Sequence, residues 1–160
     1  VGLLNVGQEP GKGNQLVQSV YPLLEELPLN FVGNIEGRDI PRGDVDVVVC
    51  DGFVGNVVLK FAEGLGASLF GMMKEEFTST FSSKVGALLL KPGLKRIKKR
   101  MDYTEYGGAP LLGVQGVSIV AHGGSNAKAI RNAIRAAKEG VDNRIVDIIE
   151  EMMVPNRAGD

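Results

Sequence analysis

The stretch that decides the fold is Val45–Lys60, with the sequence VDVVVCDGFVGNVVLK. Its first part, Val45–Cys50, is mostly apolar and β-branched, which is typical of a strand buried on both faces of a parallel sheet. Asp51–Asn56 is a turn that contains glycines. The apolar residues that follow, from about Val57 to Phe77, recur at helical spacing. A strand, a short turn and a helix in succession predict an α/β fold with a mainly parallel sheet.

The same succession occurs on both sides of this stretch. We expect further strands at Val1–Asn5, Phe31–Ile35 and Gly116–Ala121, and further helices between Asn14 and Pro28 and from about Ala127 to Met153. Asn14 is a good helix cap, and Pro28 helps to end the first of these helices. The alternation predicts a single α/β domain, or part of one, over residues 1–160.

The composition limits what this chain can be. With 160 residues, 44% of them apolar, it can bury a core, and nothing indicates disorder. The only cysteine, Cys50, excludes an internal disulfide, and its run of valines predicts a buried, inert thiol in a reducing cytoplasm. No apolar run approaches the roughly 20 residues that span a bilayer. Because the first residue is Val1, we expect a fragment of a longer chain.

Three turns at strand ends carry the side chains that could do chemistry. They are Asn34–Asp39 (NIEGRD), Asp51–Asn56 (DGFVGN) and His122–Asn126 (HGGSN). Ligands of open α/β sheets bind beyond the carboxyl ends of the strands, and the N–H groups of a helix start attract anions. The pattern therefore predicts a site for a small anion. At each turn the alternative is an ordinary structural turn or helix cap.

The turn before the last helix is the strongest case. Ser125 or Asn126 could cap that helix. The glycines Gly123 and Gly124 leave backbone N–H groups uncovered. Lys128 and Arg131, one turn into the helix, could add positive charge.

Two side chains are candidates for proton transfer. His122 is the only histidine, and at a strand end it could act as a general acid or base, or donate a hydrogen bond to phosphate. It could equally be a structural residue. Asp51 could take a proton or orient a partner, or it could hold its own turn through nearby backbone N–H groups.

Charged and amide side chains complete these turns. Asn56 is a candidate cap for the second helix, and Lys60, one turn further, could face the site or solvent. Arg38 could bind a phosphate through two hydrogen bonds, or Glu36 and Asp39 could hold it in a structural ion cluster.

Four segments, taken in order, resemble a known family. They are VGLLNVG (1–7), NFVGNIEGRDI (30–40), DVVVCDGFVGNVVLK (46–60) and MDYTEYGGAPLLGVQGVSIVAHGGSNAKAIRNAI (101–134). This set resembles the phosphate acyltransferase (PlsX) family of bacterial phospholipid synthesis, from Val1 to about Met153. Members of that family are longer, so the resemblance implies that this chain is a carboxy-terminal half. One departure is Gln8, where the family often has the first residue of an acidic pair.

The resemblance implies an activity and a fold. The activity is transfer of a fatty acyl group from acyl carrier protein to inorganic phosphate, without a cofactor, to give an acyl phosphate that a glycerol-3-phosphate acyltransferase consumes. The fold is a three-layer α/β/α sandwich like that of isocitrate and isopropylmalate dehydrogenases and of phosphotransacetylases, in a homodimer. Phosphate is then the nucleophile, and no covalent acyl-enzyme is needed.

With phosphate as the anion, the turns gain roles. We expect Asp51, His122, Arg38 and Lys60 to be catalytic, and Asn5, Asn34, Glu36, Gly52, Asn56, Gly123, Gly124, Ser125 and Asn126 to bind substrate or phosphate. Backbone N–H groups and cations could position the phosphate and stabilise the tetrahedral oxyanion.

A basic segment stands apart from the site. Seven of the 18 basic residues lie between Lys84 and Arg100, a stretch without acidic residues. We expect a projecting helical hairpin over residues 78–103, broken at Pro92-Gly93. Its expected contacts with an anionic membrane surface are Val85, Leu88, Leu89, Leu90, Lys91, Leu94 and Lys95. The alternatives are docking of acyl carrier protein and a hairpin packed on a second subunit. The expected location is the cytoplasm, at the inner face of the cell membrane.

Other functions remain open at this stage. A dehydrogenase of the related fold, with NAD and a divalent metal, would need clustered acidic ligands, and Glu36, Asp39 and Asp51 are sparse. A membrane-attached scaffold without catalysis is a further alternative. One histidine and one cysteine make a zinc site improbable. Aromatic residues do not alternate with the basic ones, so no nucleic acid is expected.

Overall fold

The computed structural model describes residues 1–100 and 102–153. Its chain divides into two compact units, Val1–Glu75 and Glu76–Asp160, called unit 1 and unit 2 here. Each unit is described by itself.

Unit 1 contains a parallel sheet of three strands, β1 (Gly2–Asn5), β2 (Asn34–Glu36) and β3 (Val48–Val49), in the order β2-β1-β3. Asn5 lies opposite Glu36 in the register of β1 and β2, which pair in parallel. The carboxyl ends of the strands therefore meet at one edge of the sheet, as the sequence predicts.

The first helix, α1 (Gln15–Glu25), begins where expected, because Asn14 caps it. Its Oδ1 accepts the N–H of Val17 over 2.9 Å. The second long helix, α2 (Gly52–Ser79), begins earlier than Val57. Asp51 precedes its first residue, so Asn56 lies inside the helix and the expectation that it is the cap is wrong. A short 3-10 helix, η1 (Ile40–Arg42), stands between β2 and β3.

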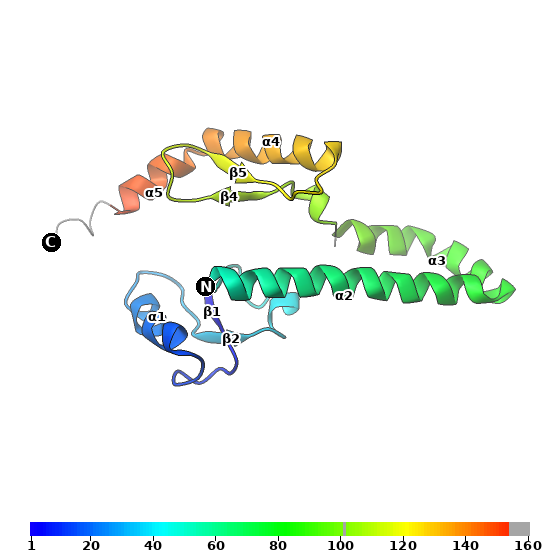
Figure 1. Ribbon diagram of the computed structural model, residues 1–160, viewed down its shortest axis with the longest axis horizontal. Coiled ribbons are helices and arrows are strands. Elements are labelled where there is room, and N and C mark those ends of the chain that lie inside the picture. Colours follow the sequence, from blue (N-terminus) through cyan, green and yellow to red (C-terminus); the bar gives the residue numbers. More distant parts are fainter. Residues whose placement is uncertain (101, 154–160) are drawn as a thin grey trace. The chain divides into compact units, whose positions relative to one another are not determined.

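Unit 2 pairs its strands differently from the expectation. β4 (Ala109–Leu111) and β5 (Ser118–Val120) form an antiparallel pair, so the segment predicted as a further parallel strand is one arm of a hairpin. The helix α4 (Ala127–Asp142) lies along this hairpin in Figure 1. A short 3-10 helix, η2 (Tyr103–Glu105), precedes β4.

Two expectations about helix continuity are wrong. The predicted helix up to Met153 is divided into α4 and α5 (Ile145–Met153), because Arg144 adopts a left-handed backbone with φ of 52°. The basic segment, in contrast, is one helix, α3 (Phe81–Arg100), which continues through Pro92 without the predicted break.

Close backbone packing joins the segment at and after η2 to α4. A β-carbon on Gly107, whose φ is +85°, would overlap the backbone of Asn132 and Ala133. The buried Nδ2 of Asn132 donates to the carbonyl of Thr104 over 2.8 Å. Glycine at position 107 is therefore required for this approach.

Little apolar surface is buried. In the described part of the chain, the buried apolar side chains are Leu3, Leu4, Ile35, Ala129 and Ala133. Cys50 is exposed, so the expectation of a buried thiol is wrong; it follows β3, at the open edge of the sheet. The structure thus has mixed α/β architecture with a mainly parallel sheet, and the three-layer sandwich stays a prediction.

The apolar face of α2 is also exposed. Phe53, Phe61 and Leu65 have 79%, 68% and 47% of their surface exposed. By length and composition alone, α2 is apolar enough to cross a membrane, with a mean hydropathy of 1.3 over its most apolar stretch. From the sequence, no apolar run was expected near the length that spans a bilayer, and by length and mean hydropathy this expectation is wrong for α2. A mean hydropathy can stay high although the helix contains a few charged residues.

Candidate functional site

Asn5, at the end of β1, is buried and holds the loop that follows its strand. Its Nδ2 donates to the carbonyl of Lys12 over 3.0 Å, and its Oδ1 accepts the N–H of Val6 over 2.8 Å. Gly13, with φ of +90°, lies so close that a β-carbon there would overlap this Oδ1. Asn5 therefore shapes the loop between β1 and α1.

Asn34 supports the same loop from the neighbouring strand. Its buried Nδ2 donates to the carbonyl of Glu9 over 2.9 Å. Its Oδ1 is also buried and has no hydrogen-bond partner among the described residues. A buried acceptor of this kind is unusual in a folded protein, and it is available to a donor from a ligand or water.

The segment Asn34–Asp39, whose first half is β2, contains an ion cluster. Nη2 of Arg38 lies 2.8 Å from Oε1 of Glu36. The buried Asp39 accepts the N–H of Glu36 over 2.9 Å and pairs with Arg42 over 3.2 Å. The sequence left open whether Arg38 binds phosphate or is held in a structural ion cluster, and its pairing with Glu36 shows that the cluster is present. The side chain of Arg38 is nevertheless 66% exposed, so an anion can reach it.

Asp51 is the cap of α2. Its Oδ1 accepts the N–H groups of Phe53 and Val54, each over 2.9 Å. Two of the N–H groups at the start of α2 that could hold an anion are therefore already bonded to Asp51. Asp51 thus holds its own turn, which is the structural role that the sequence left open for it. Lys60 lies about 12 Å along the helix from its start, by the rise of 1.5 Å per residue, so it is not one turn in.

Lys60 also has an acidic neighbour. Its Nζ lies 3.4 Å from Oε2 of Glu63, and Asn56 is exposed on the same helix. The sequence pattern predicts a helix that starts at about Val57, which would put both residues near its start. The helix in fact starts at Gly52, so both residues lie inside it.

A cavity of about 650 Å³ opens at the carboxyl ends of the strands of unit 1. Asn5 and Asp51 line it together with Cys50 and Gly37. Most of its wall is apolar and comes from α1, α2 and the strands. The structure thus brings two predicted site residues to one cavity, and adds an apolar wall that the sequence analysis missed.

In unit 2, the turn after β5 is closed by its own hydrogen bonds. The N–H of Gly124 donates to Nδ1 of His122 over 3.0 Å. A neutral imidazole carries one proton, so in this arrangement it sits on Nε2, which is then a donor. Of the roles open to His122, this arrangement favours a hydrogen-bond donor to phosphate over a general base.

The cap of α4 is Asn126 and not Ser125. Oδ1 of Asn126 accepts the N–H of Ala129 over 3.0 Å. The buried Oγ of Ser125 has no hydrogen-bond partner among the described residues, so it is the second orphaned polar atom at a predicted site residue. Gly123 is exposed beside it.

Lys128 is engaged in an ion cluster. Its Nζ lies 2.7 Å from Oε1 of Glu105 and 3.2 Å from Oδ2 of Asp102. The hydrogen bond to Glu105 is the main cause that raises the pKa of Lys128. Hydrogen bonds from the side chain and backbone of Thr104 lower the pKa of Asp102, and Lys128 adds to this. The charge of Lys128 is therefore used in ion pairs within unit 2 and is not left to attract an anion to the turn.

The predicted membrane contacts are exposed on α3. Leu88, Leu89 and Leu90 have 68%, 77% and 56% of their surface exposed. Val85, Lys91 and Lys95 are exposed as well, and Leu94 is half-buried. An exposed apolar face among lysines is compatible with an interfacial helix.

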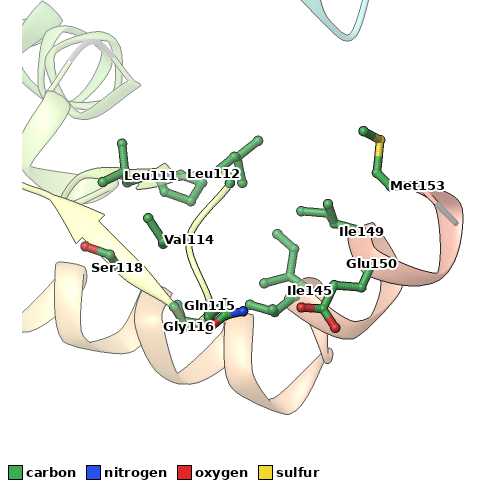
Figure 2. A pocket seen from close by; sticks show the side chains of 14 residues that line it. Leu111, Leu112, Val114, Gln115, Gly116, Ser118, Ile145, Ile149, Glu150 and Met153 are labelled. Carbon is green, nitrogen blue, oxygen red and sulfur yellow. The ribbon is translucent and has the colours of Figure 1, made fainter. Parts of the chain in front are cut away.

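A second cavity, of about 540 Å³, lies inside unit 2. Figure 2 shows Leu112 and Val114 of the segment that joins β4 to β5 on one side, and Ile145 and Ile149 of α5 on the other. The charged residue in its lining is Glu150. Sequence reasoning missed this cavity, because it depends on the division between α4 and α5. Separately, the described residues hold no group of three His, Cys, Asp or Glu side chains placed to bind a metal.

The parallel strands and the polar turns at their ends define an α/β protein with a candidate ligand site at one sheet edge. The family model described as "Fatty acid synthesis protein" matches residues 1–147, and the chain belongs to this family. It is 62% identical over 152 residues to a phosphate acyltransferase of Desulfitobacterium hafniense, with 94% of this chain and 46% of the relative covered. It is 54% identical over 160 residues to a phosphate acyltransferase of Brevibacillus brevis, with 100% and 48% covered. The chain thus spans about half the length of these curated relatives, as the resemblance implied.

Proposed function

We propose that this chain is part of an enzyme that transfers a fatty acyl group from acyl carrier protein to inorganic phosphate. The relatives' name supports an acyl transfer to phosphate. The single observation that carries the proposal is the cavity at the strand ends of unit 1, which joins polar residues to an apolar wall. Both kinds of surface are needed by a substrate with a reactive polar end and an aliphatic tail.

The reaction needs no covalent intermediate. An oxygen of hydrogen phosphate forms a bond to the thioester carbonyl carbon, and the bond from that carbon to sulfur breaks. The carrier thiol leaves with the proton that the phosphate gives up. Holding phosphate in line with the carbonyl supplies much of the rate enhancement, and donors aimed at the oxyanion supply more. The product is an acyl phosphate, for a glycerol-3-phosphate acyltransferase to consume.

Roles follow from the contacts of each residue. In unit 1, the exposed side chain of Arg38 binds phosphate, and the open acceptor of Asn34 receives a donor from the substrate. In unit 2, Nε2 of His122 and the hydroxyl of Ser125 donate to an anion. Asp51 orients the start of α2, and a role for Lys60 and Asn56 has less support, because both lie inside that helix.

The partners and location are part of the same proposal. The exposed leucines and lysines of α3 support a location at the anionic inner surface of the cell membrane. Acyl carrier protein is acidic as a family, and it delivers the substrate. The enzyme works as a homodimer in the cytoplasm.

The test is release of the carrier thiol from acyl carrier protein, measured with and without phosphate. It is run on this chain and on a fusion that adds the remaining half of the Desulfitobacterium hafniense relative. Arg38→Ala in the fusion is expected to raise KM for phosphate, with Arg135→Ala on α4 as the matched control. A fusion whose thiol release does not depend on phosphate would overturn the proposal.

A further inference from the structure

The cavity of unit 1 has one polar end and a long apolar wall. Val17 and Val20 of α1 and Val54 and Val58 of α2 line the apolar part, with Leu16 beside them. Its volume of about 650 Å³ lies in the range of small-molecule sites. This wall is too apolar for phosphate or another small anion.

The polar end coincides with the ends of β1 and β3. Asn5 and Asp51 stand there, and the carboxylate of Asp51 already accepts two backbone N–H groups. A neutral thioester fits beside these groups better than a free anion, since none of the described residues that line the cavity is a cation. Its aliphatic chain would then extend between the two helices.

We propose that this cavity binds the fatty acyl chain, with the thioester at Asn5 and Asp51 and the chain between α1 and α2. The inference rests on the proposed function, and it names the place of the substrate's tail. The cavity of unit 2 is the rival site, but Glu150 lies in its lining and none of the predicted site residues does.

The physical signature is dependence on chain length. Each pair of methylene groups that leaves water tightens binding by about tenfold. A neutral probe isolates this effect, so we choose the butanoyl, octanoyl and dodecanoyl thioesters of N-acetylcysteamine. Binding to the 160-residue chain is measured by calorimetry in phosphate-free buffer.

Variants assign the binding to one cavity. Val58→Trp fills the unit 1 cavity, and Val17→Phe does so from the opposite helix. Leu59→Trp places the same bulk on an exposed position of α2, with 65% of its surface free, and is the control. Ile149→Trp fills the rival cavity. Circular dichroism checks that each variant is folded.

The expected result is dodecanoyl binding that is at least about tenfold tighter than octanoyl binding, lost in Val58→Trp and Val17→Phe and kept in the other two variants. Absent binding, binding without chain-length dependence, or loss in Ile149→Trp alone would overturn the proposal. So would dimerisation that Val58→Trp abolishes while no thioester binds, because a second copy would then cover the cavity. Phosphate-independent thiol release with normal chain-length dependence would contradict the proposed function and leave this inference standing.

Discussion

Oδ1 of Asn5 occupies the space that a β-carbon on Gly13 would need, so the two residues fix each other. Gly13 has φ of +90°, a backbone conformation that side chains disfavour. Together they set the course of the loop from β1 to α1 at the edge of the candidate site.

The pairing predicts a stability difference between two glycines of that loop. Gly13→Ala should lower the free energy of unfolding by about 1–3 kcal/mol, because it adds both overlap and backbone strain. Gly11→Ala, where the added β-carbon meets nothing within 4 Å, should change it by less than about 1 kcal/mol. Urea unfolding measures both, and equal effects would contradict the role given to Asn5.

Two substitutions of Asp51 distinguish a role in helix capping from a role in proton transfer. Asp51→Ala should destabilise the protein by about 1 kcal/mol through loss of the α2 cap, whereas Asp51→Asn should retain most of that stability. If Asp51 only orients the helix, Asp51→Asn also keeps phosphate-dependent thiol release. Complete loss of release in a stable Asp51→Asn protein would show that its carboxylate takes part in the chemistry.

The Lys128 cluster predicts a pH dependence with a definite sign. The pKa of Asp102 is lowered from 3.8, so its contribution to stability is present above that value and is lost as the pH falls below it. The pKa of Lys128 is raised from 10.5, so its contribution is present below that value and is lost as the pH rises through the higher folded value.

Comparison with Lys128→Met tests this assignment. Its Tm should be lower than that of the wild type by a constant amount through neutral pH, and the difference should shrink at both extremes. A difference that is unchanged across the whole range would mean that the ion pairs do not contribute.

The membrane proposal is tested on α3. The double variant Leu88→Asp/Leu89→Asp should lose sedimentation with vesicles that contain anionic lipid, since charge at the apolar face opposes insertion. Ile134→Asp, at a position on α4 with 66% of its surface exposed, is the matched control. Unchanged sedimentation of the double variant would reject lipid contact. If Lys91→Glu/Lys95→Glu then impairs thiol release alone, carrier docking is the better explanation.

The sequence pattern correctly predicted the elements that depend on contacts between residues close together in the chain. The cap at Asn14 and the helix after it depend on residues a few positions apart, and both were predictable. The start of α2 was not, because Asp51 and Asn56 both have capping side chains and only the backbone path selects between them. A left-handed Arg144 leaves no trace in a hydrophobic pattern, so the break between α4 and α5 was missed as well.

Contacts between residues far apart in the chain were the part of the site that could not be predicted from the sequence. The antiparallel partner of β5 is a strand of three residues that includes Pro110, which no periodicity reveals. The turns were recognised from their glycines and amides, but their internal hydrogen bonds were not. Arg38, Asp51 and Lys128 each proved to have a protein partner, and both cavities depend on residues far apart in the sequence.

The most direct test of the central claim is thiol release from acyl carrier protein by the fusion that contains this chain, followed as phosphate is titrated. If phosphate is the acyl acceptor, release rises with phosphate to saturation, and acyl phosphate forms in an amount equal to the free thiol. Release at the same rate without phosphate, or thiol formed without acyl phosphate, would contradict it.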